Sequence, residues 1–431
     1  MYKRNNSRNL ILALVAFVFV TAFYSCSSNV VEGQLTGVER DQEWNGISPL
    51  GMSYIPSGTF MMGQSDQDIN FTLTQQNRSV SVQGFYMDNT EITNSEYRQF
   101  SNWVRDSIAL TALDQFIEDE SGNTSLDWDY PIDWMEGSED AEALNDLFYQ
   151  GDDMLFGKKE LNPEKIMYKY RKFDMKGQAS SRHDRSVPRS TYITEHEVEI
   201  LPDNLCWVAD FSYSYNEPMA RQYFDHPAFD DYPVVGVTWH QADAFSAWRT
   251  LLWNSQAAMM EEQEIENFRL PTEQEWEYAA RGGLNGAPYP WGGPYIRNRQ
   301  GCLLANFKPG RGNYPEDGGY YTVKVASYHP NDYGLYDMSG NVAEWTSTAY
   351  YEEGYRFNHD MNSEIPYVHG PTPDVDITQT RVSIRGGSWK DIGYYLQTGT
   401  RHWEYADTSK SYIGFRCALT FLGRSMSDFS N

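Results

Sequence analysis

The stretch that decides the fold lies towards the C-terminal end of the chain and reads Gly334-Leu335-Tyr336-Asp337-Met338-Ser339-Gly340-Asn341-Val342-Ala343-Glu344-Trp345. Two further phrases follow it, Arg385-Gly386-Gly387-Ser388-Trp389 and Gly414-Phe415-Arg416-Cys417. The glycine pair Gly386-Gly387 indicates a close approach of two backbone segments, because glycine has no Cβ atom. Neither a glycine-rich phosphate loop nor a nucleophile elbow is present in the sequence.

Capping boxes predict where helices begin. Thr and Glu or Gln stand three residues apart at Thr93, Thr238 and Thr272, and apolar residues at helical spacing follow each of them. Residues 51–63 contain short apolar runs punctuated by Gly and Pro, which favours hairpin strands. The sequence therefore predicts three short helices among glycine-rich, proline-rich and aromatic loops.

Several phrases in this order resemble the formylglycine-generating-enzyme, or sulfatase-modifying-factor, family. Besides the three quoted above, they lie at residues 55–63, 85–96, 232–239, 269–283 and 289–292. The resemblance covers residues 51–421 apart from one insertion. It implies an α+β fold of the C-type-lectin-like kind, rich in loops, with short helices and strands.

The residues at the catalytic positions of this family differ in this chain. The resemblance implies that the family's oxidase binds copper through two cysteines, which lie two and seven residues after Gly-Gly-Ser-aromatic. Here those positions hold Asp391 and Leu396, neither of which supplies a thiolate. A related branch binds iron through two histidines four residues apart, and no pair of histidines here has that spacing. We therefore expect a pseudoenzyme without copper and without catalytic residues.

Calcium binding is a second property that the resemblance implies. Calcium prefers several oxygen ligands and accepts backbone carbonyls beside carboxylates. Matched residue by residue, one site would use Asn306, the Phe307 carbonyl, Asp317 and the Gly319 carbonyl, and the other Asp337, the carbonyls of Gly340 and Val342, and Glu344. The alternative is that Asp337 and Glu344 only accept hydrogen bonds from loop amides.

Three cysteines remain after Cys26, namely Cys206, Cys302 and Cys417, so at most one disulfide can form within the chain. The resemblance places Ser246 where the family has the partner of Cys417. We therefore expect Cys417 to be a buried free thiol.

Length and composition allow either two domains or one domain with large insertions, since the chain has 431 residues. Aromatic residues make up 15% of the chain, enough for a large core. With 60 acidic and 34 basic residues, the net charge is −26, which argues against nucleic-acid binding.

The predicted insertion spans about residues 105–225, and its charge is segregated. Residues 110–157 contain 14 acidic residues and no Lys or Arg, whereas residues 158–189 contain ten basic and four acidic residues. These charges can neutralise each other within one molecule, or they can form complementary surfaces between subunits or partners. The sequence leaves both interpretations open.

The N-terminus has the pattern of a bacterial lipoprotein signal peptide. Basic Lys3, Arg4 and Arg8 precede an apolar run over residues 10–23, and Cys26 follows as the predicted lipid attachment site. An ordinary signal peptide with an incidental cysteine is the alternative. We expect a signal peptide over 1–25, a tether over 26–48, the family domain over 49–421 and a C-terminal tail over 422–431.

Phrases outside the general family indicate a closer relationship. They are Cys26, residues 34–38 and 48–52, residues 100–108, and the end of the insertion at 206–211, 216–219 and 226–227. They resemble the PorK/GldK family of ring lipoproteins in type IX protein secretion and gliding motility, with the GldJ-type gliding lipoproteins as the nearest alternative. This resemblance implies a lipid anchor in the outer membrane, facing the periplasm, and a homo-oligomeric ring built with a PorN/GldN-type ring protein.

The sequence thus predicts a structural, non-catalytic protein of a secretion ring. Two other functions stay open at this point. One is an enzyme of the formylglycine-generating family that modifies exported proteins by a route using Asp391. The other is a glycan-binding module, suggested by the lectin-like fold and the abundant Tyr and Trp.

Overall fold

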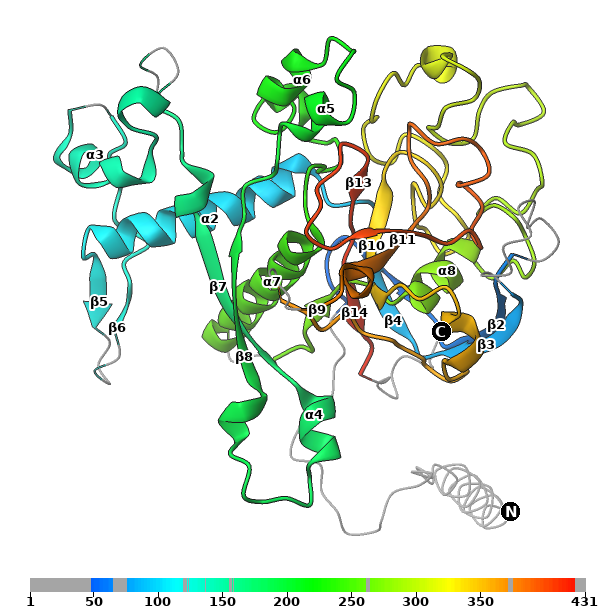
Figure 1. Cartoon of the computed structure of the whole chain (residues 1–431), viewed down its shortest axis with the longest axis horizontal. Helices are drawn as coiled ribbons and strands as arrows, with labels where there is room; N and C mark the ends of the chain where they lie inside the picture. Colours follow the sequence, from blue (N-terminus) through cyan, green and yellow to red (C-terminus); the bar gives the residue numbers. More distant parts are fainter. Residues whose placement is uncertain are drawn as a thin grey trace, which may run out of the picture. The chain divides into compact units, whose positions relative to one another are not determined.

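The computed structural model describes residues 48–422, except 65–75, 119–121, 123, 136, 155–156, 158, 261–263 and 371–374 (Figure 1). The predicted signal peptide, the lipid site Cys26, the tether up to residue 47 and the tail from residue 423 lie outside these residues. Within the described part of the chain, no helix is long and apolar enough to cross a membrane.

Two four-stranded sheets organise the domain. The first has the order β1 (Met52–Ile55), β4 (Phe85–Asp88), β14 (Ala418–Thr420) and β9 (Phe268–Arg269), all antiparallel. The second has the order β12 (His402–Tyr405), β11 (Arg381–Arg385), β10 (Ala343–Ala349) and β13 (Ile413–Gly414), with β13 parallel to β10. The last strand of the domain, β14, therefore pairs with β4 from the start of the domain and with β9. This mixed architecture confirms the predicted α+β, loop-rich fold.

The strands predicted over residues 51–63 form, but they do not make a hairpin with each other. Strand β1 pairs with β4, whereas β2 (Gly58–Met62) pairs over its full length with β3 (Arg78–Val82). The two strands therefore enter different sheets. Ile55 of β1 and Phe60 and Met62 of β2 are buried in the cluster that contains Trp276 of α8. Met52 of β1 packs instead with Phe268 of β9 and Leu419 of β14, in the sheet that β1 joins.

All three predicted helix starts are confirmed. Helices α2 (Asn94–Ala112), α7 (Trp239–Met259) and α8 (Glu273–Arg281) begin after Thr93, Thr238 and Thr272, each with a complete capping box. The prediction of short helices is correct only for α8, because α2 has 19 residues and α7 has 21. Neither sequence contains a Gly or Pro that would end the helix earlier.

The insertion begins inside α2 and continues through many small elements. They are β5 (Phe116–Glu118), β6 (Thr124–Leu126), α3 (Glu139–Ala143), β7 (Met167–Phe173), α4 (Met175–Ser180), β8 (Ile193–Glu199), α5 (Cys206–Ala209) and α6 (Glu217–Gln222), with short 3₁₀ turns at Asn145–Leu147, Gly151–Asp153, Pro163–Lys165, Arg189–Tyr192 and Pro227–Phe229. The remaining elements of the domain are 3₁₀ turns at Tyr314–Asp317 and Ile377–Thr380 and helix α9 (Gly354–Phe357).

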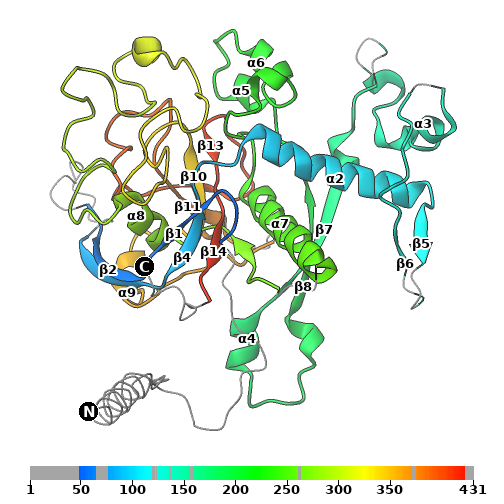
Figure 2. The ribbon, with the colours of Figure 1, turned by 180° about the vertical axis from the view of Figure 1, so that it is seen from behind.

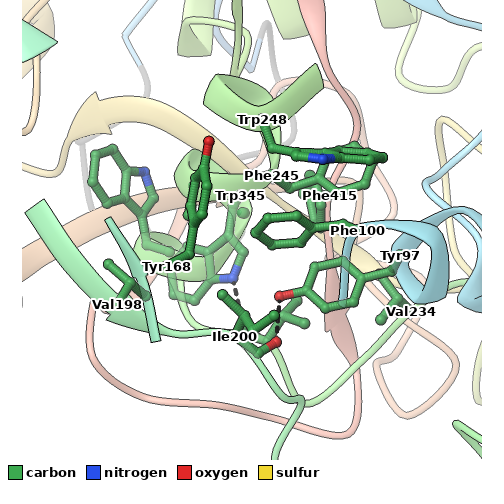
Figure 3. Close-up of a cluster of buried hydrophobic side chains, with 14 of the residues drawn as sticks. Tyr97, Phe100, Tyr168, Val198, Ile200, Val234, Phe245, Trp248, Trp345 and Phe415 are labelled. Carbon is green, nitrogen blue, oxygen red and sulfur yellow. Dashed lines mark hydrogen bonds between the residues drawn. The ribbon is translucent and has the colours of Figure 1, made fainter. Parts of the chain in front are cut away.

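The largest core cluster joins the insertion to the family domain (Figure 3). Tyr97 of α2 stacks on Phe245 of α7, with ring centroids 5.7 Å apart, and its hydroxyl donates to the Ile200 carbonyl at 2.8 Å. Tyr168 of β7 packs edge-on against Phe100 at 5.3 Å. The base of the insertion is therefore part of the hydrophobic core, and its outer part extends from it.

Candidate functional site

The family phrases converge where α8 packs against β10 and β11 (Figure 2). Gly386 and Gly387 follow β11 and both have positive φ, 94° and 68°. A Cβ atom would lie 3.2 Å from the Trp276 ring at Gly386 and 2.7 Å from the Tyr395 carbonyl oxygen at Gly387. The predicted close backbone approach is confirmed, since no other residue fits Gly387 without displacing main chain.

A buried ion pair between Arg416 and Glu344 lies at one side of the site. Arg416 donates from Nε and Nη2 to the Glu344 carboxylate at 2.7 and 2.6 Å, and both side chains are almost completely buried. Trp276 Nε1 donates to the same carboxylate at 2.7 Å. Both Glu344 oxygens are therefore already occupied by protein donors.

Two more buried carboxylates lie close to this pair. Burial raises the pKa of Glu91 well above its ordinary value, and the charges of Asp337 and Glu344 raise it further. Burial also raises the pKa of Asp337, to about 6. Asp337 accepts a hydrogen bond from the Ala326 amide through Oδ2, whereas its buried Oδ1 has no hydrogen-bond partner within the described residues.

A second ion network holds the other side of the site. The Arg385 guanidinium, fully buried, contacts Glu277 at 2.9 Å and Glu273 at 3.1 Å, and it donates to the Tyr355 hydroxyl at 2.7 Å. Arg401 shares Glu273 at 2.7 Å. Burial alone would raise the pKa of Glu273, but the two guanidinium groups outweigh it and the pKa is lowered. These contacts join the end of β11 to α8.

A cavity of about 260 Å³ lies at the end of β11. Its lining includes Arg385, Lys390, Asp391, Tyr395, His402 and Tyr412. Burial lowers the pKa of both Lys390 and His402, although Asp391 opposes the shift in each. The Lys390 ammonium lies 3.1 Å from the centroid of the Tyr412 ring. The cavity thus combines two cationic groups, one carboxylate, one imidazole and the rings of two tyrosines.

Asp391 and Leu396, which the resemblance matches to the copper ligands of the family, lie in different environments. Asp391 lines the cavity, where its Oδ2 accepts a hydrogen bond from the Ser388 hydroxyl at 2.6 Å. Leu396 is fully buried in an apolar cluster with Tyr289, Leu303 and Phe307. Copper bound by soft ligands needs thiolates, and this pair offers one hard oxygen donor and a hydrocarbon. The residues do not fit copper.

The residues predicted to bind calcium are brought together in part. Gly319 and Gly340 both lie against Asn306, since a Cβ atom on them would be 2.6 Å from its Oδ1 and 2.4 Å from its carbonyl oxygen. The side chain of Asp317 lies outside the described part of the structure. Phe307 is buried in the apolar cluster that contains Leu396. The two loops that carry the predicted sites are therefore neighbours.

In the second predicted site, the two carboxylates, Asp337 and Glu344, differ in how well they fit a cation. The free Oδ1 of Asp337 fits a cation, because a buried carboxylate oxygen without a partner is costly. Glu344 fits less well, because Arg416 and Trp276 occupy its oxygens. Calcium binding stays a prediction for Asp337 with the Gly340 and Val342 carbonyls.

Cys417 is buried and free, as predicted. Its sulfur lies 3.4 Å from the Ser246 hydroxyl, and burial raises the pKa of the thiol to about 12. Cys206 is a second buried free thiol, and Cys302 is exposed. A thiolate is the reactive form of cysteine, so Cys417 is chemically inert near neutral pH.

Sequence reasoning missed several residues of the site. Glu91 and Arg416 stand inside the phrases at residues 85–96 and 414–417, but the sequence does not show that Arg416 pairs with Glu344 or that Glu91 lies close to this pair. Lys390 lies directly before Asp391, and His402 lines the same cavity. The adjacency of Lys390 to Asp391 was the one available signal.

These features define a protein with the fold of the formylglycine-generating enzymes and a cavity lined by Lys390, Asp391 and His402. The family model for the sulfatase-modifying factor enzyme 1-like domain matches residues 41–421, and the chain belongs to this family.

Three comparisons place it among known proteins. The inactive Cα-formylglycine-generating enzyme 2 of Bos taurus is 34% identical over 47% of this chain and 57% of its own length. The formylglycine-generating enzyme of Mus musculus is 27% identical over 88% of this chain and 78% of its own length. The solved structure of PvdO from Pseudomonas aeruginosa covers 86% of this chain and 94% of its own, with 16% identity and a TM-score of 0.44. The chain spans only about half the length of the inactive relatives of Bos taurus and Mus musculus.

Proposed function

We propose that this protein is a structural, non-catalytic subunit of a secretion ring, of the PorK/GldK type, anchored by lipid at Cys26 to the periplasmic face of the outer membrane. The observation that carries the non-catalytic part is the cavity at the end of β11. Where the family oxidase needs two thiolates, this chain has Asp391 held by Ser388 and Leu396 buried in hydrocarbon. Its similarity to proteins named inactive formylglycine-generating enzymes supports the same role.

Other features of the chain support its proposed role as a ring subunit. The signal-peptide pattern and Cys26 supply a membrane anchor, and a lipid repeated on many copies strengthens attachment by avidity. The rigid ion networks of Arg385 and Arg416 keep the fold stiff without a redox site. The insertion supplies surfaces for a PorN/GldN-type partner and for further copies of the chain. Of the two paralogous types, the GldJ type is the alternative within the same proposal.

Metal analysis and an oxygen-uptake assay test the non-catalytic role. The purified full chain should contain no copper after incubation with copper salts, and it should consume no oxygen with a cysteine-containing peptide. Calcium should be present, and the Asp337→Gly variant should lose it. Glycine is chosen because residue 337 has a φ of 55°, in the left-handed region.

Asp332→Gly, at an exposed position five residues before Asp337, is the matched control for calcium and should keep the metal. Stoichiometric copper together with peptide-dependent oxygen uptake would overturn the non-catalytic assignment. Absence of calcium from the wild-type protein would remove the calcium prediction alone.

A further inference from the structure

The two hairpins of the insertion, β7–β8 and β5–β6, differ in whether their charged residues form ion pairs. In the long hairpin β7–β8, Lys169 pairs with Glu197 at 3.2 Å and Arg171 with Glu195 at 3.8 Å across the strands. Lys172 pairs with Asp243 of α7 at 2.5 Å. The basic residues of the stem are therefore neutralised within the molecule, but by acids outside residues 110–157. Among the described residues, no ion pair joins the acidic stretch 110–157 to the basic stretch 158–189.

The tip of the same hairpin keeps an excess of positive charge. We call residues 174–193 the basic tip; it carries Lys176, Arg182, Arg185 and Arg189 against two aspartates. Both aspartates accept hydrogen bonds from neighbouring residues. Asp174 caps α4, and Asp184 accepts from the amide and the hydroxyl of Ser186. Lys176 pairs with Glu364, and Arg189 lies over the Phe173 ring. Arg182 and Arg185 are exposed and make no ion pair with any described residue.

The small hairpin β5–β6 has the opposite charge. We call residues 114–129 the acidic hairpin; its described acids are Asp114, Glu118, Asp127 and Asp129, and none of them pairs with a Lys or Arg of the described chain. Residues 114–129 contain no Lys or Arg, and their sequence also includes Asp119 and Glu120, which lie outside the described residues. Every residue of β5 is exposed, whereas β6 contacts α2 and Trp128 stacks on Trp103 of α2 with ring centroids 5.2 Å apart.

Both surfaces also expose apolar side chains. In the acidic hairpin, Phe116, Ile117 and Trp128 are 46, 48 and 47% exposed. In the basic tip, Met175 and Ile193 are 68 and 42% exposed. Exposed apolar groups surrounded by charge are typical of protein contacts. The two surfaces thus match in apolar character and are opposite in sign.

We propose that the basic tip of one copy docks onto the acidic hairpin of a second copy of this chain. Among the described residues no ion pair joins the two surfaces within one molecule, and they are separate projections of the insertion (Figures 1 and 2). A contact between two different patches is head-to-tail, and such contacts generate rings when the rotation closes. This inference rests on the proposed function, because it gives the ring a contact between its copies.

A charge-swap experiment tests the contact. The full chain, extracted in detergent, is examined by analytical ultracentrifugation as wild type, as R182E/R185E and as D114N/E118K/D127K/D129K. The wild type should form oligomers that dissociate at high salt, and each variant alone should be at least tenfold weaker in self-association. An equimolar mixture of the two variants should assemble again, because each surface then faces its opposite charge. The control R299E/R311E reverses two exposed basic residues elsewhere and should assemble like the wild type.

The contact is refuted if both variants assemble like the wild type, or if their mixture stays monomeric. Thermal melting of each variant, expected to match the wild type, separates misfolding from a lost contact. Binding of a ring partner is scored on the same samples. If the wild-type chain binds its partner but does not self-associate, the inference fails and the proposed function stands.

Discussion

Replacing Arg416 by Met should lower the free energy of unfolding by about 3–5 kcal/mol, because it leaves the Glu344 carboxylate charged and buried without its cation. The guanidinium makes two hydrogen bonds to Glu344 and further ones to the carbonyls of Asp88 and Tyr336. Glu91 and Asp337 lie close enough for their charges to act on one another, so the variant buries several acids with no base. Urea denaturation of the wild-type and variant proteins measures the difference.

The matched control is Arg221→Met, which breaks an exposed pair between Arg221 and Glu217 and should have a much smaller effect. Adding Glu344→Gln to the Arg416→Met variant should recover part of the loss, because a neutral amide costs less to bury than a carboxylate. A loss for Arg416→Met no larger than that of the control would contradict the buried-pair account.

Cys26→Ala should remove the protein from the membrane fraction. Lipid chains stabilise membrane attachment by about 0.8 kcal/mol per buried CH₂ group, so loss of the acylated cysteine removes the whole anchor. Fractionation of cells, with a high-salt wash to break protein contacts, measures the distribution. Cys302→Ala, which removes an exposed thiol of the domain, is the matched control and should stay in the membrane fraction. A Cys26→Ala protein that pellets with membranes after the wash would refute lipid anchoring at this residue.

Local features of this fold could be predicted from the sequence. A capping box depends on residues three apart, so the starts of α2, α7 and α8 followed directly from Thr93, Thr238 and Thr272. The close approach at Gly386-Gly387 and the burial of Cys417 beside Ser246 also agreed with the expectation.

Pairings between distant segments could not be predicted in the same way. Strands β1 and β2 are separated by two residues but join different sheets, because their partners come from elsewhere in the chain. The pairing of Arg416 with Glu344 joins residues 72 positions apart, and no local pattern reports it. The charge of the insertion was visible, but only the structure shows that the stem of β7–β8 neutralises itself while the tip does not.

We propose above that this member of the sulfatase-modifying-factor family works as an assembled ring subunit. Cross-linking in intact cells, followed by purification of the full chain and identification of its partners, tests it most directly. We expect a large assembly that contains many copies of this chain together with a PorN/GldN-type ring protein. A monomer recovered with every envelope partner present in the cell would contradict the account.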